Sequence, residues 1–234
     1  MKTYSSLVIS LFFIINTVFS QAATSRKGWY VEPFVGHHQL AVSFSERSYF
    51  AFGQRESKSG FLAGGKVGWQ FPAGVNLQAG IFLAPKGLTV TNLNIPPLSE
   101  EEVFSDVTLD YQTLHFPLLL GYQFDLSERF SLRPSLGLIF GTSFNHTYEE
   151  VVTNRPMSFM TIGPARVVFE KFDLGYTGEL SFLYKIKPNI SLTLNGSFLR
   201  NEILVQVFPD FSKGRRITMF NEGFYFTIGP QVRF

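Results

Sequence analysis

Apolar and polar or small residues alternate with a period of two in about eight segments, and this pattern constrains the fold more than any other feature of the sequence. In the last segment Phe224, Phe226 and Ile228 share one parity, and residues such as Thr227 and Gly229 share the other. A period of two is that of a β-strand with one apolar face, and no segment shows a convincing helical repeat. The predicted strands cover residues 29–40, 61–71, 75–84, 113–124, 130–140, 173–186, 190–198 and 223–234.

The predicted connections alternate between short and long. Three are tight and carry turn residues, at 72–74, 125–129 and 187–189. Short turns at one end and long polar loops at the other are typical of an up-and-down outer-membrane barrel, whose turns face the periplasm and whose loops face outside. The predicted outer loops are residues 43–59, 86–110, 142–171 and 201–218.

The composition of the two strand faces indicates which solvent they meet. Charged residues make up only 16% of the chain and Phe alone accounts for 27 residues, whereas an average soluble domain is about 25% charged. A soluble sandwich or lipocalin-like barrel also alternates, but its outer face is charged, and here the non-apolar face is mainly Gly, Ser, Thr, Asn and Gln. The apolar face therefore suits lipid, with polar and small residues filling a narrow lumen. We predict an all-β fold, an eight-stranded antiparallel up-and-down transmembrane β-barrel, whose hairpins project beyond the outer surface.

The first 22 residues have the pattern of a secretory signal peptide. Lys2 precedes an apolar run at residues 7–15, and the small residues Ser20 and Ala22 follow. The run is shorter than the ~20 residues that a spanning helix needs. We expect cleavage near residues 20–22, a barrel domain at residues 23–234 and a location in the bacterial outer membrane.

The last strand resembles the assembly signal of bacterial outer-membrane barrels, because alternating apolar residues, several of them aromatic, lead to a terminal Phe. The resemblance implies folding by the barrel-assembly machinery. The residues that carry it are Phe224, Phe226, Ile228, Val232 and Phe234.

Two further segments, YQTLHFPLLLGYQF and FDLGYTGELSFLY, resemble the PorT-like outer-membrane barrel family of bacteroidetes. Pro117 matches that family's pattern, but His115 stands where an acid is usual. Gly175 and Gly178 match the glycine pattern, while Leu180 replaces a further small residue. The size is also similar to that of the OmpA/OmpX type. Some PorT-like relatives act in secretion or as surface receptors, so the resemblance implies such roles here.

Charged and polar residues on the lumen face are the main candidate site. One interpretation is a salt-bridged network that plugs the barrel, since buried charges must be paired. The other is a selectivity ring in a pore, and we favour the plug because eight strands enclose little more than side chains. The predicted network is Glu32, Lys66, His115, Arg133, Asp173, Glu179, Lys185 and Arg233.

Other chemistries have weak support. The chain has no Cys, which excludes thiol nucleophiles and Cys-based zinc sites, and a net charge of +2 gives no indication of nucleic-acid binding. His37 and His38 are adjacent on a strand and point to opposite faces, so they cannot chelate one ion together. No metal or cofactor is expected.

The segment 142–171 leaves two alternatives open, a lid or binding surface and an extended hairpin arm. Ser143, His146 and Glu149 within it have the residue types of a triad, which some lipid A-modifying barrels carry near the outer leaflet.

We expect a non-catalytic barrel with a structural, adhesive or receptor-like role, or one in secretion. A lipid A-modifying enzyme and a narrow pore are the alternatives. The expected surroundings are membrane lipid, lipopolysaccharide and an extracellular protein or ligand at the outer loops, with the protein a monomer.

Overall fold

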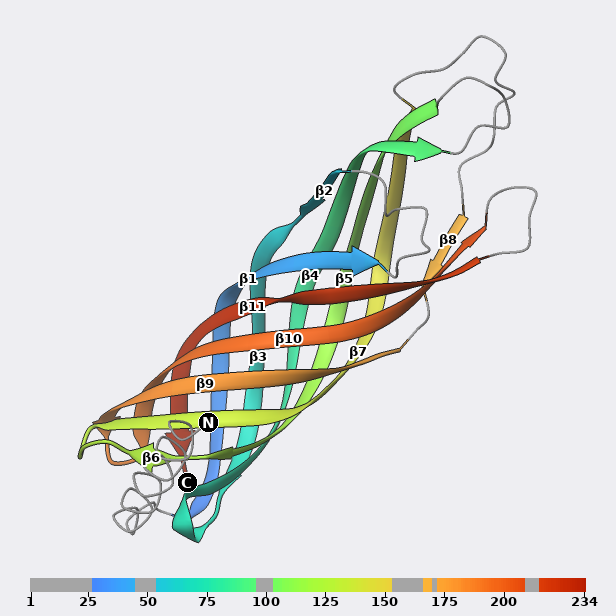
Figure 1. Ribbon diagram of the computed structural model, residues 1–234. Helices are drawn as coiled ribbons and strands as arrows, with labels where there is room; N and C mark the ends of the chain where they lie inside the picture. The colour runs from blue at the N-terminus through green and yellow to red at the C-terminus, as the bar shows by residue number, and fades with distance from the viewer. Residues whose placement is uncertain (1–26, 45–53, 96–102, 153–165, 170–171, 209–214) are drawn as a thin grey trace, which may run out of the picture.

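The computed structural model describes residues 27–44, 54–95, 103–152, 166–169, 172–208 and 215–234 (Figure 1). The expected signal peptide lies outside these residues. Among the residues described, no helix has the length and apolar character that crossing a membrane requires. The strands are β1 Gly28–Phe44, β2 Gln54–Ser57, β3 Ser59–Gln70, β4 Val75–Ile95, β5 Val103–Tyr122, β6 Phe124–Asp125, β7 Phe130–Val152, β8 Arg166–Phe169, β9 Asp173–Lys187, β10 Ile190–Phe208 and β11 Arg215–Arg233.

The strands close into one antiparallel barrel. Neighbours follow the order β11, β1, β3, β4, β5, β7, β9 and β10, and β10 pairs with β11 to complete the ring. The short strands β2, β6 and β8 lie along β4, β7 and β10, where they continue β3, β5 and β9. The wall thus has eight strands, and the predicted fold class is confirmed. Closure satisfies the backbone groups that lipid cannot.

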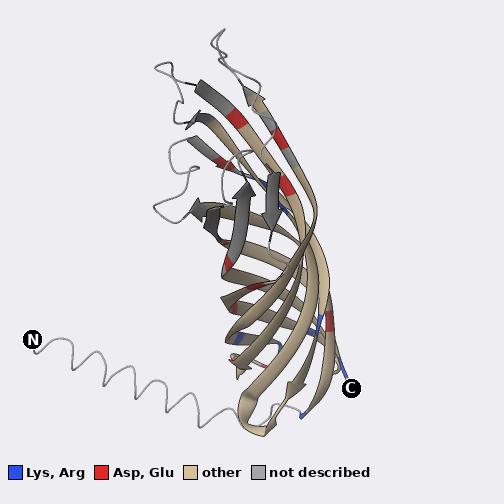
Figure 2. Cartoon of the chain, turned by 90° about the vertical axis from the view of Figure 1, so that its right-hand side faces the viewer, with Lys and Arg blue, Asp and Glu red and all other residues tan. Residues whose placement is uncertain are grey.

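Alternate residues of each strand face outward and form an apolar band. This band is the expected lipid contact, and Figure 2 shows long uncharged stretches along the strands. Its exposed side chains include Val31, Val35, Phe61, Val67, Leu77, Ile81, Leu118, Leu120, Leu136, Leu138, Phe140, Leu174, Phe182, Leu192, Leu194, Phe226 and Ile228.

Aromatic pairs mark the end of the band at the short turns. The rings of Trp29 and Trp69 meet edge to face at 4.9 Å between centroids, and those of Phe130 and Tyr184 lie 5.0 Å apart. Such girdles are typical of a membrane interface. The C-terminus and the start of β1 lie at this end (Figure 1), which the short turns identify as periplasmic.

The three predicted tight turns are confirmed, and one has special backbone geometry. A 3₁₀ turn at Pro72–Gly74 joins β3 to β4. Ala73 and Gly74 have φ of 71° and 89°, a region that glycine enters freely and alanine rarely. The other turns occupy residues 126–129 and 188–189.

Large parts of the predicted outer loops belong to strands. Residues 86–95, 103–110, 142–152, 201–208 and 215–218 continue the strands of the barrel. β4, β5 and β7 rise well above the end of β1 (Figure 1), and acidic positions gather on this projecting part (Figure 2). Inward-facing and outward-facing side chains still alternate along the strands in this projecting part. The segment 142–152 is thus an extended hairpin arm, while residues 153–165 lie outside the described part.

The lumen is layered, which the sequence did not indicate. A charged layer lies toward the periplasmic end, and an apolar layer lies above it. Charged, polar and small side chains were expected in the lumen, but an apolar layer was not. The buried apolar cluster contains Phe34, Leu40, Leu62, Phe82, Ala84, Ile139, Leu199 and Tyr225.

Candidate functional site in the lumen

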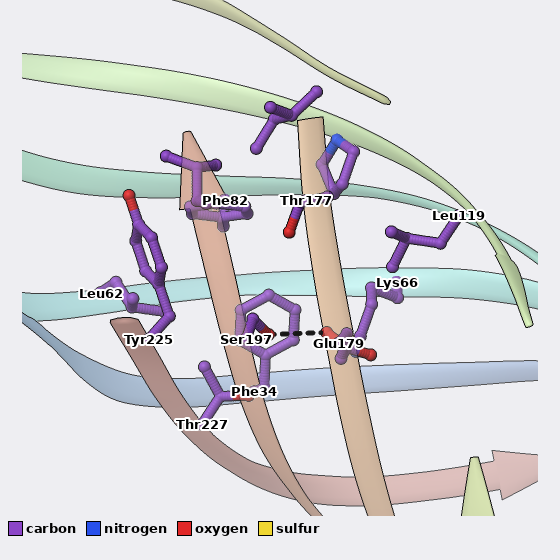
Figure 3. A pocket seen from close by; sticks show the side chains of 13 residues that line it. Phe34, Leu62, Lys66, Phe82, Leu119, Thr177, Glu179, Ser197, Tyr225 and Thr227 are labelled. Atoms are coloured by element: carbon purple, nitrogen blue, oxygen red, sulfur yellow. Dashed lines mark hydrogen bonds and ion pairs between the residues drawn. The ribbon is translucent and has the colours of Figure 1, made fainter. Parts of the chain in front are cut away.

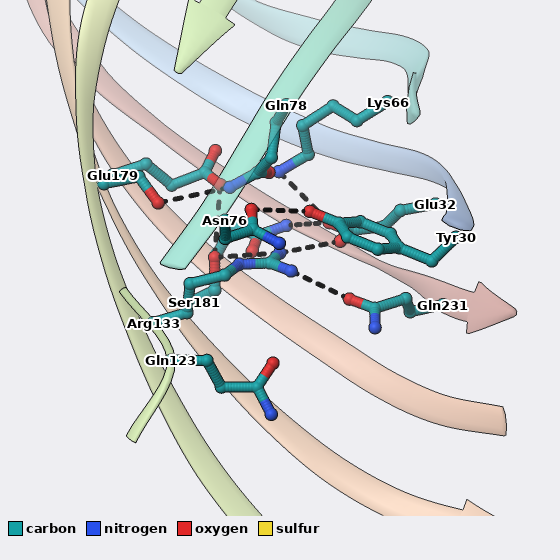
Figure 4. A network of polar contacts seen from close by, with 12 residues as sticks. Tyr30, Glu32, Lys66, Asn76, Gln78, Gln123, Arg133, Glu179, Ser181 and Gln231 are labelled. Carbon is teal, nitrogen blue, oxygen red and sulfur yellow. Dashed lines mark hydrogen bonds and ion pairs between the residues drawn. The ribbon is translucent and has the colours of Figure 1, made fainter. Parts of the chain in front are cut away.

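Four charged side chains from four strands form a continuous network across the lumen (Figure 4). Glu32 lies at its centre, with Oε2 2.9 Å from Arg133 Nη2 and Oε1 3.1 Å from Lys66 Nζ. Lys66 Nζ also lies 2.7 Å from Glu179 Oε1. We call these residues, Glu32, Lys66, Arg133 and Glu179, the charged layer. Its two acids and two bases balance, as charges removed from water require.

Strand register brings these groups to one level. Glu32 on β1 pairs directly with Lys66 on β3, and Arg133 on β7 pairs with Ser181 on β9. All of these side chains share the inward parity of their strands. Glu179 joins them from β9, two residues from Ser181 and on the same face.

Neutral polar groups complete the coordination of the charges. Asn195 Nδ2 donates to Glu32 Oε1 at 2.8 Å, and Arg133 Nη1 donates to Gln231 Oε1 at 2.9 Å. The hydroxyls of Ser181 and Ser197 both donate to the Glu179 carboxylate at 3.1 Å. Bonds to charged groups are stronger than neutral ones, so the layer is held by several strands at once.

Tyr30 seals the network on its periplasmic side. Its ring lies 5.2 Å from the Arg133 guanidinium, and its hydroxyl donates to Asn76 Oδ1 at 2.8 Å. The ring fits because Gly68 lies opposite, where a Cβ would come within 2.2 Å of it. Asn76 in turn donates to Gln70 at 3.0 Å. The lumen is thus filled by bonded side chains at this level.

A small cavity of about 30 Å³ lies in the lumen, next to the charged layer on its extracellular side (Figure 3). Phe34, Phe82 and Tyr225 form much of its wall, and Lys66 and Glu179 border it. A space of this size accommodates about one or two water molecules.

The structure places the eight residues of the predicted network at three levels. Glu32, Lys66, Arg133 and Glu179 meet in the charged layer. His115 and Asp173 are buried further from the periplasmic end, where His115 pairs in register with Phe82 of the apolar cluster. Lys185 is exposed and Arg233 half-buried, at the periplasmic rim, where Arg233 Nη2 donates to Gln123 at 3.4 Å.

Other lumen residues escaped the sequence analysis. Lys86 was expected in an outer loop, but it is buried with an exposed fraction of 4%. The available signal was its parity, because it continues the inward series Phe82 and Ala84 on β4. His38, expected at a strand end as half of a chance pair, is fully buried, while His37 is exposed.

The three residues with triad chemistry do not converge. Ser143 pairs with Thr113 on the inner face of β7, and their hydroxyls lie 3.2 Å apart. Glu149 pairs with Thr108, one residue from the inward-facing Leu109, and so lies on the outer face. The His146 ring stacks on Tyr111 at 6.2 Å. In the part of the chain that the structure describes, no group of three His, Cys, Asp or Glu residues could hold a metal ion.

A protein-family model described as "Outer membrane protein beta-barrel domain" matches residues 19–202. The chain belongs to this family. Membership identifies it as a β-barrel protein of the bacterial outer membrane. No curated protein matches the chain.

Solved structures support the same fold. OprG of Pseudomonas aeruginosa is similar with a TM-score of 0.59 at 14% identity, covering 91% of this chain and 98% of that one. AlkL, solved in lipid bilayers, has a TM-score of 0.52 at 11% identity, covering 91% and 92%. At these identities the likeness concerns the fold alone.

Proposed function

We propose that this protein is a non-catalytic, non-conducting barrel that acts as a receptor or adhesive protein through the outer ends of its strands. The observation that carries the proposal is the charged layer, whose bonded side chains fill the lumen. A barrel closed at this level offers no wide path for solutes, so its contacts with the surroundings must be made elsewhere.

The outer ends of β4, β5 and β7 supply such a surface. They extend the barrel beyond the apolar band and carry acidic residues, including Asp106 and Glu149. Loops and hairpins on a rigid scaffold are common binding sites. The partner in this proposal is an extracellular protein or ligand, and the barrel lies as a monomer in lipid and lipopolysaccharide. The residues that would direct assembly by the barrel-assembly machinery, from Phe224 to Phe234, lie on β11 and at its end.

A surface pull-down with shortened hairpins tests this function. Thr89 and Thr108 are register partners on β4 and β5, so a two-residue turn in place of residues 90–107 shortens the hairpin without shifting its register. The matched variant replaces residues 204–218 between Ile203 and Met219. We expect one of these variants to lose a specific partner that the intact protein captures. Equal capture by all three proteins, or steady ion conductance by the intact barrel in a planar bilayer, would contradict the proposal.

A secretion-associated role is a narrower form of the same proposal, in which the partner belongs to a secretion machinery. A narrow pore is the second candidate, favoured by the cavity of about 30 Å³ beside the charged layer. Conductance measurements separate it from the receptor role.

A further inference from the structure

A second polar layer crosses the lumen at the outer part of the apolar cluster, with which it shares Tyr225. Unlike the charged layer, it contains no ion pair among the described residues. All of its members have exposed fractions of 6% or less. We call this set the outer polar layer: His38, Lys86, Tyr111, His115, Asp173, Asn201, Asn221 and Tyr225.

Register and contacts join the six strands that supply these residues. His115 on β5 pairs with Gly141 on β7, which pairs with Asp173 on β9. Asn201 on β10 donates to the Asp173 carboxylate, and Asn201 pairs with Asn221 on β11. The layer therefore spans this side of the barrel without interruption.

Lys86 joins the layer from β4, the neighbour of β5 in the wall. Its charge acts electrostatically on His38, on His115 and on Asp173. The His38 ring lies 5.7 Å from that of Tyr225. In register Lys86 pairs with Tyr111 of the neighbouring strand β5, which also carries His115.

Several buried polar atoms of this layer lack a hydrogen-bond partner in the described part of the chain, whereas most polar atoms of the charged layer are hydrogen-bonded. Neither ring nitrogen of His115 has a hydrogen-bond partner among the described residues, and neither has Lys86 Nζ. Tyr225 Oη and Asn221 Nδ2 are in the same position. The His38 ring has no side-chain partner there and lies against the backbone of Pro85. Buried polar groups are nearly always bonded, and a buried cation without a partner is especially unfavourable. A ligand that accepts hydrogen bonds would satisfy them.

The chemistry of these atoms indicates the class of ligand. Five of the side chains can donate, namely Lys86, His38, His115, Asn221 and Tyr225. Among the unpartnered atoms, the two that can only accept a hydrogen bond are Asp173 Oδ1 and Asn201 Oδ1. The other Asp173 oxygen already accepts a hydrogen bond from Asn201. We propose that Lys86, His38 and His115 form a binding site for a small free oxyanion of the carboxylate or phosphate class. Asp173 balances Lys86 when the site is empty.

The cavity beside the layer is too small, at about 30 Å³, to hold such a ligand without a movement of its walls. Phe82 and Tyr225 line the cavity, and each also packs against a histidine of the outer polar layer, Phe82 at 4.8 Å from His115. In Figure 3 the Tyr225 hydroxyl points away from Glu179. The proposal therefore requires these two rings to rotate, so that the cavity and the layer share one space. The charged layer closes the periplasmic side, so the ligand enters from outside.

The test uses the full barrel in lipid nanodiscs, with acetate and inorganic phosphate as probes and chloride at matched ionic strength as the reference. Histidine ring ¹⁵N resonances and thermal unfolding report binding, because a ligand that binds only the folded state stabilises it. We expect at least one oxyanion to give saturable shifts of the His38 and His115 signals. Lys86→Met and His38→Gln should weaken its binding by tenfold or more.

Matched controls lie outside the lumen. Lys58→Met removes an exposed lysine that pairs with Asp110, and His37→Gln removes the outward-facing neighbour of His38. Both should bind the oxyanion as the parent protein does. Lys86→Met should also make the ligand-free barrel less resistant to heat, because it leaves the buried Asp173 carboxylate without its counter-charge.

Three outcomes would overturn the proposal. One is an equal response to chloride, and another is saturable binding that survives Lys86→Met. The third is the absence of any saturable shift in the parent protein, which would leave only bound water to satisfy these atoms. The last measurement needs no variant, so the proposal stays testable if a substituted barrel does not fold.

Discussion

Arg133 Nη2 lies 2.9 Å from Glu32 Oε2, and both side chains are completely excluded from solvent although 101 residues separate them in the sequence. The contact crosses the lumen from β7 to β1, strands that are not neighbours in the wall. It therefore stabilises the closed barrel rather than any single hairpin.

The first prediction concerns this pair. Arg133→Met leaves Glu32 buried with one cationic partner, Lys66, so we expect a loss of about 3 to 5 kcal/mol in the free energy of unfolding. Denaturant unfolding in lipid vesicles measures it. Adding Glu32→Gln should cost less than the sum of the single changes, since the two groups interact.

An exposed pair on the wall is the control. Arg200 Nε lies 3.3 Å from Glu222 Oε1, with both side chains more than a third exposed. Arg200→Met should cost about 1 kcal/mol or less. If Arg133→Met lowered the free energy of unfolding no more than Arg200→Met does, the charged layer would contribute little to stability.

The second prediction concerns the space between Tyr30 and Gly68. A Cβ on Gly68 would lie 2.2 Å from the Tyr30 ring, so Gly68→Ala should destabilise the barrel by about 1 to 3 kcal/mol. Gly65 on the same strand faces outward, with its nearest atom at 3.8 Å, and Gly65→Ala should be nearly neutral. If the clash is the cause, the Gly68→Ala penalty should shrink in a Tyr30→Ala background.

Strand faces could be predicted from the sequence because a period of two persists wherever one face meets lipid. The alternation of Phe224, Phe226 and Ile228 sufficed to place β11, and the outward residues are exposed as expected. Strand ends could not be predicted in the same way. Beyond the membrane the alternation continues, as in Leu88 and Val90, but these segments are polar overall, so strand residues such as Val90 and Thr147 were assigned to loops.

The levels of the lumen were also beyond the sequence. Parity gives the face of a residue but not its height, which depends on strand tilt and register. Lys185 shares a face with Glu179 but lies six residues further on, about 20 Å along the strand, and so it reaches the rim. Lys86 was missed because Pro85-Lys86-Gly87 has the composition of a turn, although its parity is inward.

The third prediction concerns conductance. Replacing Glu32 and Arg133 together by Ala removes the central pair of the charged layer and opens space toward the cavity. We expect a steady ion conductance in planar bilayers that the parent protein does not show. The control is the double change of Lys58 and Asp110 to Ala, which removes an exposed pair at 2.6 Å. Conductance in the control alone would assign the ion path to another part of the barrel.

The last prediction tests the position of the apolar band along a single strand. Leu136 on β7 is 74% exposed at the middle of the band, and Val151 on the same strand is 62% exposed near its outer end. In lipid vesicles Leu136→Arg should cost about 2 to 4 kcal/mol and Val151→Arg about 0 to 1 kcal/mol, because the penalty for a lipid-facing charge falls with distance from the bilayer midplane. Denaturant unfolding of both variants gives the two values under identical conditions. Equal penalties would contradict the assignment of the outer end of β7 to the aqueous side of the membrane, since both side chains point outward and differ only in their height on the wall.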